Sequence, residues 1–220
     1  MLTKTTDARP AYIHSIAVTG NYVFLTIWQA DFAFYGLATL RNRNILDGLA
    51  QWDDKRLTLQ YMIDRLTGEI VGKFTSAPMF SSHHINAYEE DREDGAKDVV
   101  VDMSTYADIS FVSAGKVESM RNFKRDQIGL PRYHRFLLSL TFPGEKKPLI
   151  GEEAIVVVWP WSDINVELAC MNPLFQHHKA RNIYGSHHTQ SSETNDVCFD
   201  SIIKIDRDHP ALHDGDDPDK

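Results

Sequence analysis

The dominant pattern along the chain is an alternation of apolar and polar positions with a period of two residues. It is clearest over residues 16–27, 57–63, 70–74, 135–141 and 197–205. A period of two is typical of strands that bury one face. We expect about nine or ten strands at a spacing of roughly ten residues. The pattern therefore predicts an all-β chain.

Short turn sequences separate several of these strands. Thr19-Gly20-Asn21, Leu66-Thr67-Gly68, Glu93-Asp94-Gly95 and Pro143-Gly144-Glu145 each combine residues that favour tight turns. We expect a hairpin at each, and a helix only at roughly residues 41–51. At about four strands per blade the chain would supply two to three blades of a β-propeller. The pattern alone fits a sandwich or a barrel equally well.

Composition narrows the classes of partner. The 220 residues are 42% hydrophobic and carry a net charge of −8, which argues against binding of nucleic acid. No apolar stretch approaches the ~20 residues that span a membrane, and the N-terminus has no apolar signal core. We expect a cytoplasmic protein. Residues 1–208 are predicted to form the folded domain, followed by an acidic, disordered tail at 209–220.

Histidines are the candidate chemical groups. The chain has ten, with adjacent pairs at 83/84, 177/178 and 187/188. Neutral imidazole suits iron, copper and zinc, but a lone histidine such as His14 is more often a satisfied or exposed side chain. The pairs 177/178 and 187/188 lie in polar sequence, and we expect them to be solvated. Glu167, flanked by apolar residues, is the best candidate carboxylate to accept the second ring N–H of a ligand histidine.

Context changes the interpretation of two histidines. The run His83-His84-Ile85-Asn86-Ala87-Tyr88-Glu89-Glu90 resembles the third metal-ligand motif of the carotenoid cleavage oxygenases, although Ser82 stands where that family usually has an aromatic residue. His14-Ser15-Ile16-Ala17-Val18-Thr19 resembles the second ligand motif. Glu167-Leu168-Ala169-Cys170-Met171-Asn172-Pro173 resembles a later segment of the family. The resemblance covers residues 11–206 in order and is closest in style to the fungal branch.

The resemblance implies a fold and a metal site. The fold would be part of a seven-bladed β-propeller, roughly its middle blades. A single Fe²⁺ would be held by four histidines, of which His14 and His83 would be two, with Glu167 as hydrogen-bond partner of a ligand. His84 occupies a position that is not always histidine in the family. The other two ligands would lie outside this chain, and we expect the chain alone to be inactive.

The resemblance also implies a reaction. The family uses Fe²⁺ and O₂ to split a conjugated carbon–carbon double bond of a carotenoid or apocarotenoid into two carbonyl products. Some fungal relatives cleave stilbenes instead. A non-catalytic, lipid-binding remnant is the alternative from another class, because two ligands are absent. Phe80 and Trp161 are candidates for the tunnel wall, although aromatic residues in such a chain more often belong to the core.

One apolar segment has two interpretations. In the family, a region after the second ligand carries an apolar patch that dips into the membrane to collect lipophilic substrate. Alternatively the segment is buried core. On the first interpretation, membrane contact would be peripheral rather than spanning. The residues concerned are Phe32, Phe34, Tyr35 and Leu37.

Overall fold

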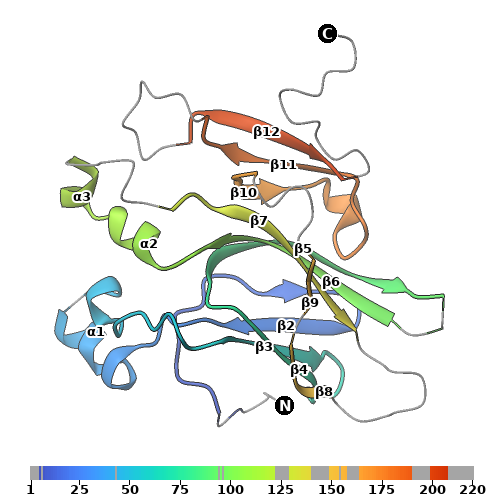
Figure 1. Cartoon of the computed structure of the whole chain (residues 1–220), viewed down its shortest axis with the longest axis horizontal. Coiled ribbons are helices and arrows are strands. Elements are labelled where there is room, and N and C mark those ends of the chain that lie inside the picture. Colours follow the sequence, from blue (N-terminus) through green and yellow to red (C-terminus); the bar gives the residue numbers. More distant parts are fainter. Residues whose placement is uncertain are drawn as a thin grey trace.

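The described strands form three β-sheets, and β8 (Leu149–Glu153) and β9 (Ile155–Val157) return late in the chain to the first and second of them (Figure 1). The computed structural model describes residues 5, 7–42, 44–93, 95, 97–121, 129–139, 149–153, 155–157, 164–189 and 199–207. Strands dominate these residues and helices are short. The all-β prediction is confirmed. The predicted tail at 209–220, the turn at 143–145 and Trp161 lie outside the described residues.

The first sheet has the order β1-β2-β3-β4-β8. Its strands are β1 (Ala17–Val18), β2 (Tyr22–Ile27), β3 (Thr58–Asp64), β4 (Ile70–Ser76) and β8 (Leu149–Glu153). β1 to β4 pair antiparallel, and β8 adds parallel to β4. The predicted turn between β3 and β4 is present: Asp64 Oδ1 accepts from the backbone N–H groups of Leu66 and Thr67, and Gly68 takes φ +73°.

The second and third sheets complete the described fold. The second contains β5 (Phe80–Asp91), β6 (Lys97–Tyr106), β7 (Arg132–Ser139) and β9 (Ile155–Val157), all antiparallel. The third contains β10 (Glu167–Cys170), β11 (Asn182–His187) and β12 (Ser201–Asp206), also antiparallel. The predicted hairpins around residues 20 and 94 are confirmed.

The helical prediction was wrong in position. Helix α1 (Leu37–Asn42) ends where the helix was expected to begin, and a single 3-10 turn, η2 (Leu46–Gly48), follows it. Gly48 packs so closely on Thr39 that a Cβ there would lie 2.1 Å from the threonine hydroxyl. Such short helices depend on tertiary contacts rather than on intrinsic propensity, so pattern alone locates them poorly. The remaining ones are η1 (Ala33–Gly36), α2 (Ser110–Ala114), α3 (Val117–Arg121) and η4 (Pro173–Phe175).

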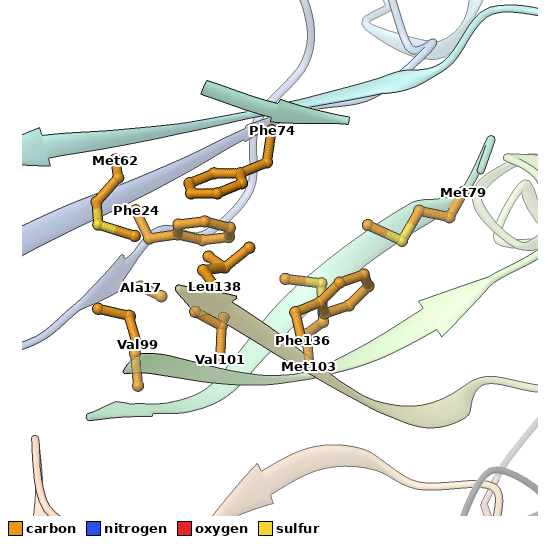
Figure 2. Packing of buried hydrophobic residues seen from close by; sticks show 11 residues of the cluster. Ala17, Phe24, Met62, Phe74, Met79, Val99, Val101, Met103, Phe136 and Leu138 are labelled. Atoms are coloured by element: carbon orange, nitrogen blue, oxygen red, sulfur yellow. The ribbon is translucent and has the colours of Figure 1, made fainter. Parts of the chain in front are cut away.

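Each sheet packs on the next through its own apolar layer. Figure 2 shows the layer between the first two sheets, where Phe24, Met62 and Phe74 meet residues of β6 and β7 such as Phe136. A side chain of this size contributes roughly 1.5–3 kcal/mol when fully buried. A second layer joins the second and third sheets, with Ile85, Tyr133, Val166, Ile183 and Ile205.

The first strands of the three sheets are neighbours. β5 contacts β1 on one side and β10 on the other (Figure 1). This is the arrangement of consecutive propeller blades, whose innermost strands surround a common axis. Because His14 precedes β1, His83 lies in β5 and Glu167 begins β10, the fold brings three separate segments to one place.

Candidate metal centre

A cavity of about 360 Å³ lies at the meeting point of the three first strands. His14, His83 and Glu167 all line it. The rings of His14 and His83 are 5.1 Å apart, centroid to centroid, and meet edge to face at 80°. The structure thus places together the three residues that the sequence singled out, although they are separated by up to 153 positions in the chain.

His83 is fixed by a buried carboxylate. Its Nδ1 lies 2.6 Å from Oε2 of Glu167, a residue only 2% exposed. The hydrogen bond to Glu167 raises the pKa of His83, against the opposing effect of burial. An imidazole that donates Nδ1–H to a carboxylate keeps its Nε2 lone pair available, which is the usual support of a metal-ligating histidine.

Glu167 is itself held from three sides. Ser82 Oγ donates to its Oε1 at 2.7 Å, and the backbone N–H of Leu168 donates to Oε2 at 2.9 Å. Burial alone would raise the pKa of Glu167, but the hydrogen bonds from His83, Ser82 and Leu168 lower it. A bulge in β10 directs the side chain, and Leu168 takes the left-handed conformation (φ +48°) within it.

His14 is supported differently. Its Nδ1 lies 2.9 Å from the hydroxyl of Tyr12, two residues earlier on the same side of an extended segment. Tyr12 is anchored through its backbone, because its N–H donates to the carbonyl of Ala30 and its carbonyl accepts from Trp28 Nε1. His14 is exposed at the cavity rim, whereas His83 is half-buried.

Both imidazoles fit a metal. Among the described residues, neither Nε2 has a hydrogen-bond partner, and each Nδ1 is already engaged. Within the same part of the chain no group of three or more histidine, cysteine or acidic side chains is placed to hold an ion. The pair therefore fits part of a larger donor set and not a complete site.

His84 lies outside this arrangement. Its Nδ1 is 2.7 Å from Ser15 Oγ, and its ring packs against Trp28 and Phe24. Burial, and next the charge of His83, lowers the pKa of His84 to about 4. Adjacent positions of a strand point to opposite faces, so only one histidine of the pair can line the cavity.

The other histidine pairs are not uniformly solvated, as had been expected. His188 is 3% exposed, and His187 Nδ1 lies 2.8 Å from the carbonyl of Asn165. His177 is half-buried, with Nδ1 2.5 Å from the carbonyl of Val18. Only His178 is exposed. The polar sequence around the pairs concealed these contacts with the first sheet and with the segment before β10.

The rest of the cavity wall is mainly apolar. It includes Phe111 and Val112 of α2, which sequence reasoning missed because that helix was not predicted. Phe111 stacks on Tyr106 with centroids 4.5 Å apart and planes at 18°. Phe80 lines the cavity as one interpretation expected, and it is also fully buried. Tyr12 could have been found from its spacing of two from His14.

The apolar segment after the first histidine is exposed. Phe34, Tyr35 and Leu37 are 79, 88 and 66% exposed, and Phe32 is half-buried. The buried-core interpretation is therefore wrong for the first three. The segment forms η1 and enters α1, with Phe34 and Tyr35 at positive φ. Across the described ranges, no helix is long and apolar enough to cross a membrane.

Two curated relatives are similar in sequence to most of this chain. Torulene dioxygenase of Fusarium fujikuroi is 26% identical over 218 residues, covering 90% of this chain and 37% of the relative. Carotenoid dioxygenase of Neurospora crassa is 27% identical over 198 residues, covering 80% of this chain and 32% of the relative. The chain spans about a third of the length of these curated relatives.

Solved structures show the same fold. Cobalt-substituted apocarotenoid oxygenase of Synechocystis superposes with a TM-score of 0.64 at 20% identity, over 89% of this chain and 36% of that one. Lignostilbene dioxygenase of Pseudomonas brassicacearum gives a TM-score of 0.56 at 17% identity, over 82% and 34%. The fold is therefore part of a β-propeller.

The family assignment rests on most of the chain. The model of the retinal pigment epithelial membrane protein family matches residues 2–214. A metal centre belongs to this family. With the propeller sheets, the paired imidazoles and this match, the chain belongs to the retinal pigment epithelial membrane protein family, the carotenoid oxygenases.

Proposed function

We propose that the protein containing this chain cleaves a conjugated carbon–carbon double bond of a carotenoid or apocarotenoid, using Fe²⁺ and O₂. One observation carries the proposal. His14 and His83 present free Nε2 atoms at an apolar cavity, and the Nδ1 of His83 is held by buried Glu167. The names of the fungal relatives support the same chemistry.

The residues have separate roles. His14 and His83 would hold the iron through Nε2, and Glu167 keeps Nδ1 of His83 protonated so that its Nε2 stays unprotonated. Iron would supply activation of O₂ beside the double bond. The protein contributes orientation and the exclusion of water, which its apolar cavity wall favours. Four neutral ligands would leave the full charge on the metal. Because this chain supplies two imidazoles, two further ones are expected from outside it.

The cavity favours an extended hydrocarbon over a phenolic stilbene. Phe80, Phe111, Val112, Leu168 and Phe199 supply apolar wall. A phenolic substrate needs a dedicated hydrogen-bond partner for its hydroxyl. In the described wall Tyr12 and Ser82 already serve His14 and Glu167.

The decisive experiment measures products. The assay uses the longest naturally encoded protein that contains this chain, loaded anaerobically with Fe²⁺. Torulene, an apocarotenal and a hydroxystilbene are then added separately in air. We expect aldehyde products from a polyene and none from the His83→Ala variant. Hydroxybenzaldehydes alone would establish the stilbene-cleaving alternative. Iron binding without any product would favour the non-catalytic lipid-binding remnant.

The exposed apolar segment suggests how a lipophilic substrate arrives. Phe34, Tyr35 and Leu37, with neighbouring Leu40, would contact a membrane surface peripherally from the cytoplasm. Replacing Phe34, Tyr35 and Leu37 by serine should reduce sedimentation with phospholipid vesicles while leaving turnover of detergent-solubilised substrate unchanged. Equal sedimentation of both forms would remove the membrane role.

A further inference from the structure

Two hydroxyl side chains, Ser82 and Tyr106, lie near the Glu167 carboxylate, and Tyr106 has no role so far. Ser82, next to His83, donates through Oγ to Oε1 of Glu167. Tyr106 ends β6 opposite Phe80, and it is 2% exposed. Its ring is held by Phe80 and by the stacked Phe111, so its hydroxyl has a fixed direction.

The Tyr106 hydroxyl is a buried donor without a partner. It forms no well-aligned hydrogen bond with a described residue, although buried hydroxyls are normally paired and Glu167 and Ser82 lie close to it. Burial first, and then the nearby Glu167 carboxylate, raises the pKa of Tyr106. The phenol therefore stays protonated at neutral pH and keeps a hydrogen to donate.

Glu167 has a matching place for that hydrogen. An ionised carboxylate accepts about four hydrogen bonds, two at each oxygen. Among the described residues Oε2 accepts from His83 and from the Leu168 N–H, whereas Oε1 accepts from Ser82 alone. An unpaired donor and an unfilled acceptor thus lie beside each other in one buried region.

We propose that Ser82 and Tyr106 are positioning residues which hold Oε1 of Glu167, so that Oε2 faces Nδ1 of His83 and orients that imidazole for the metal. The inference rests on the proposed function, because it gives the orientation of His83 a purpose. It also gives a role to Ser82, which stands where the family motif usually has an aromatic residue. A phenylalanine at position 82 would have no hydroxyl to donate to Glu167.

The test compares three single substitutions in the whole 220-residue chain. Ser82→Ala and Tyr106→Phe each remove one hydroxyl group that could donate to Glu167. Tyr61→Phe is the matched control, because Tyr61 is also 2% exposed but its hydroxyl donates to Asp7 in the first sheet. Two readouts are the dissociation constant for Co²⁺ and the tautomer of His83 in the metal-free chain, read from ¹⁵N–¹H correlations.

The expected result is specific to the Glu167 region. Ser82→Ala and Tyr106→Phe should each weaken Co²⁺ binding about tenfold, as loss of outer hydrogen bonds typically does. The fraction of His83 carrying hydrogen on Nδ1 should fall in the same two variants. Tyr61→Phe should lower the melting temperature by losing its own hydrogen bond, with affinity and tautomer unchanged.

Other outcomes separate the two proposals. Wild-type affinity and tautomer in both variants would overturn the positioning role. If Tyr106→Phe does not fold, Ser82→Ala decides alone, because Ser82 is only half-buried. If the wild-type chain binds no Co²⁺, its metal role fails, while the His83 tautomer still tests whether Ser82 and Tyr106 position Glu167.

Discussion

His83 and His84 are neighbours in sequence and opposites in environment. His83 turns to the cavity, pairs with Glu167 and has a raised pKa. His84 turns to the other face of β5, pairs with the neutral Ser15 hydroxyl and has a pKa lowered to about 4. Two identical side chains thus differ in their partners and in the protonation state that folding favours.

The difference shows what makes a histidine fit for a metal. A carboxylate behind Nδ1 favours the tautomer that offers Nε2, and an adjacent cavity gives access. His84 lacks the carboxylate, since its Nδ1 meets the hydroxyl of Ser15 and its Nε2 lies 3.5 Å from Thr26 Oγ1. Residue type and position in a motif are therefore weaker criteria than the partner on the second nitrogen.

The largest expected effect comes from removing each histidine in turn. His83→Ala should weaken Co²⁺ binding by more than the ~10–100-fold typical of losing an outer partner. His84→Ala should leave affinity unchanged but destabilise the chain by about 1 kcal/mol, because Ser15 loses its side-chain partner and keeps only the backbone N–H of residue 84. Calorimetric titration and urea unfolding measure the two effects. A loss of affinity in His84→Ala but not in His83→Ala would reverse the assignment.

Removing the carboxylate should have the next largest effect. Glu167→Gln keeps the shape but lets the amide present its NH₂ to His83, so the tautomer is no longer fixed. Metal affinity should fall ~10–100-fold. Glu69→Gln, at an exposed position, is the control and should match wild type. An unchanged Co²⁺ dissociation constant for Glu167→Gln would show that this carboxylate does not support the site.

Lowering the pH should change the contributions of His83 and His84 to folding stability in opposite directions in the metal-free chain. The folded state disfavours protonated His84, so its contribution to stability is present above pH 6.5 and is lost as pH falls toward 4. The folded state favours protonated His83, whose contribution is present below pH 6.5 and is lost as pH rises through its raised pKa.

Unfolding free energy measured against pH tests this. Relative to wild type, His84→Leu should reduce the loss of stability between pH 6.5 and 4, and His83→Gln should reduce the loss on the alkaline side. If the slope of unfolding free energy against pH is the same in wild type and in both variants, the pKa of neither side chain changes on folding.

The smallest effect is expected at His14. Tyr12→Phe removes a neutral partner from the exposed His14, so Co²⁺ affinity should fall less than in Glu167→Gln. The comparison ranks the two supports directly by titration. If Tyr12→Phe costs more affinity than Glu167→Gln, His14 is the more dependent ligand and the ranking is wrong.

The sequence predicted strands and turns well because each depends on local chemistry. Alternation predicted β2 and β3. Gly68 and Gly95 predicted the turns between β3 and β4 and between β5 and β6, where they take φ +73° and +82°. Helices α2 and α3 were missed because two short helices carry little periodicity and form through packing.

The site was predictable only in part. Family motifs selected His14, His83 and Glu167, and the structure places them at one cavity. Their metal role stays a prediction. Ser82 and Tyr106 were not selected because their contribution depends on contacts between strands, which no local pattern records, whereas the spacing of Tyr12 from His14 was a local signal that went unused. Whether Phe34 is buried or exposed could not be predicted either, because burial depends on tertiary packing.

The most direct test of the metal assignment is a crystal structure of the chain loaded anaerobically with Fe²⁺, with anomalous scattering to locate the ion. The account predicts an iron peak at the cavity, bonded to Nε2 of both His14 and His83, with Glu167 still on Nδ1 of His83. A peak at His84 instead, or an iron bound without either Nε2, would contradict it.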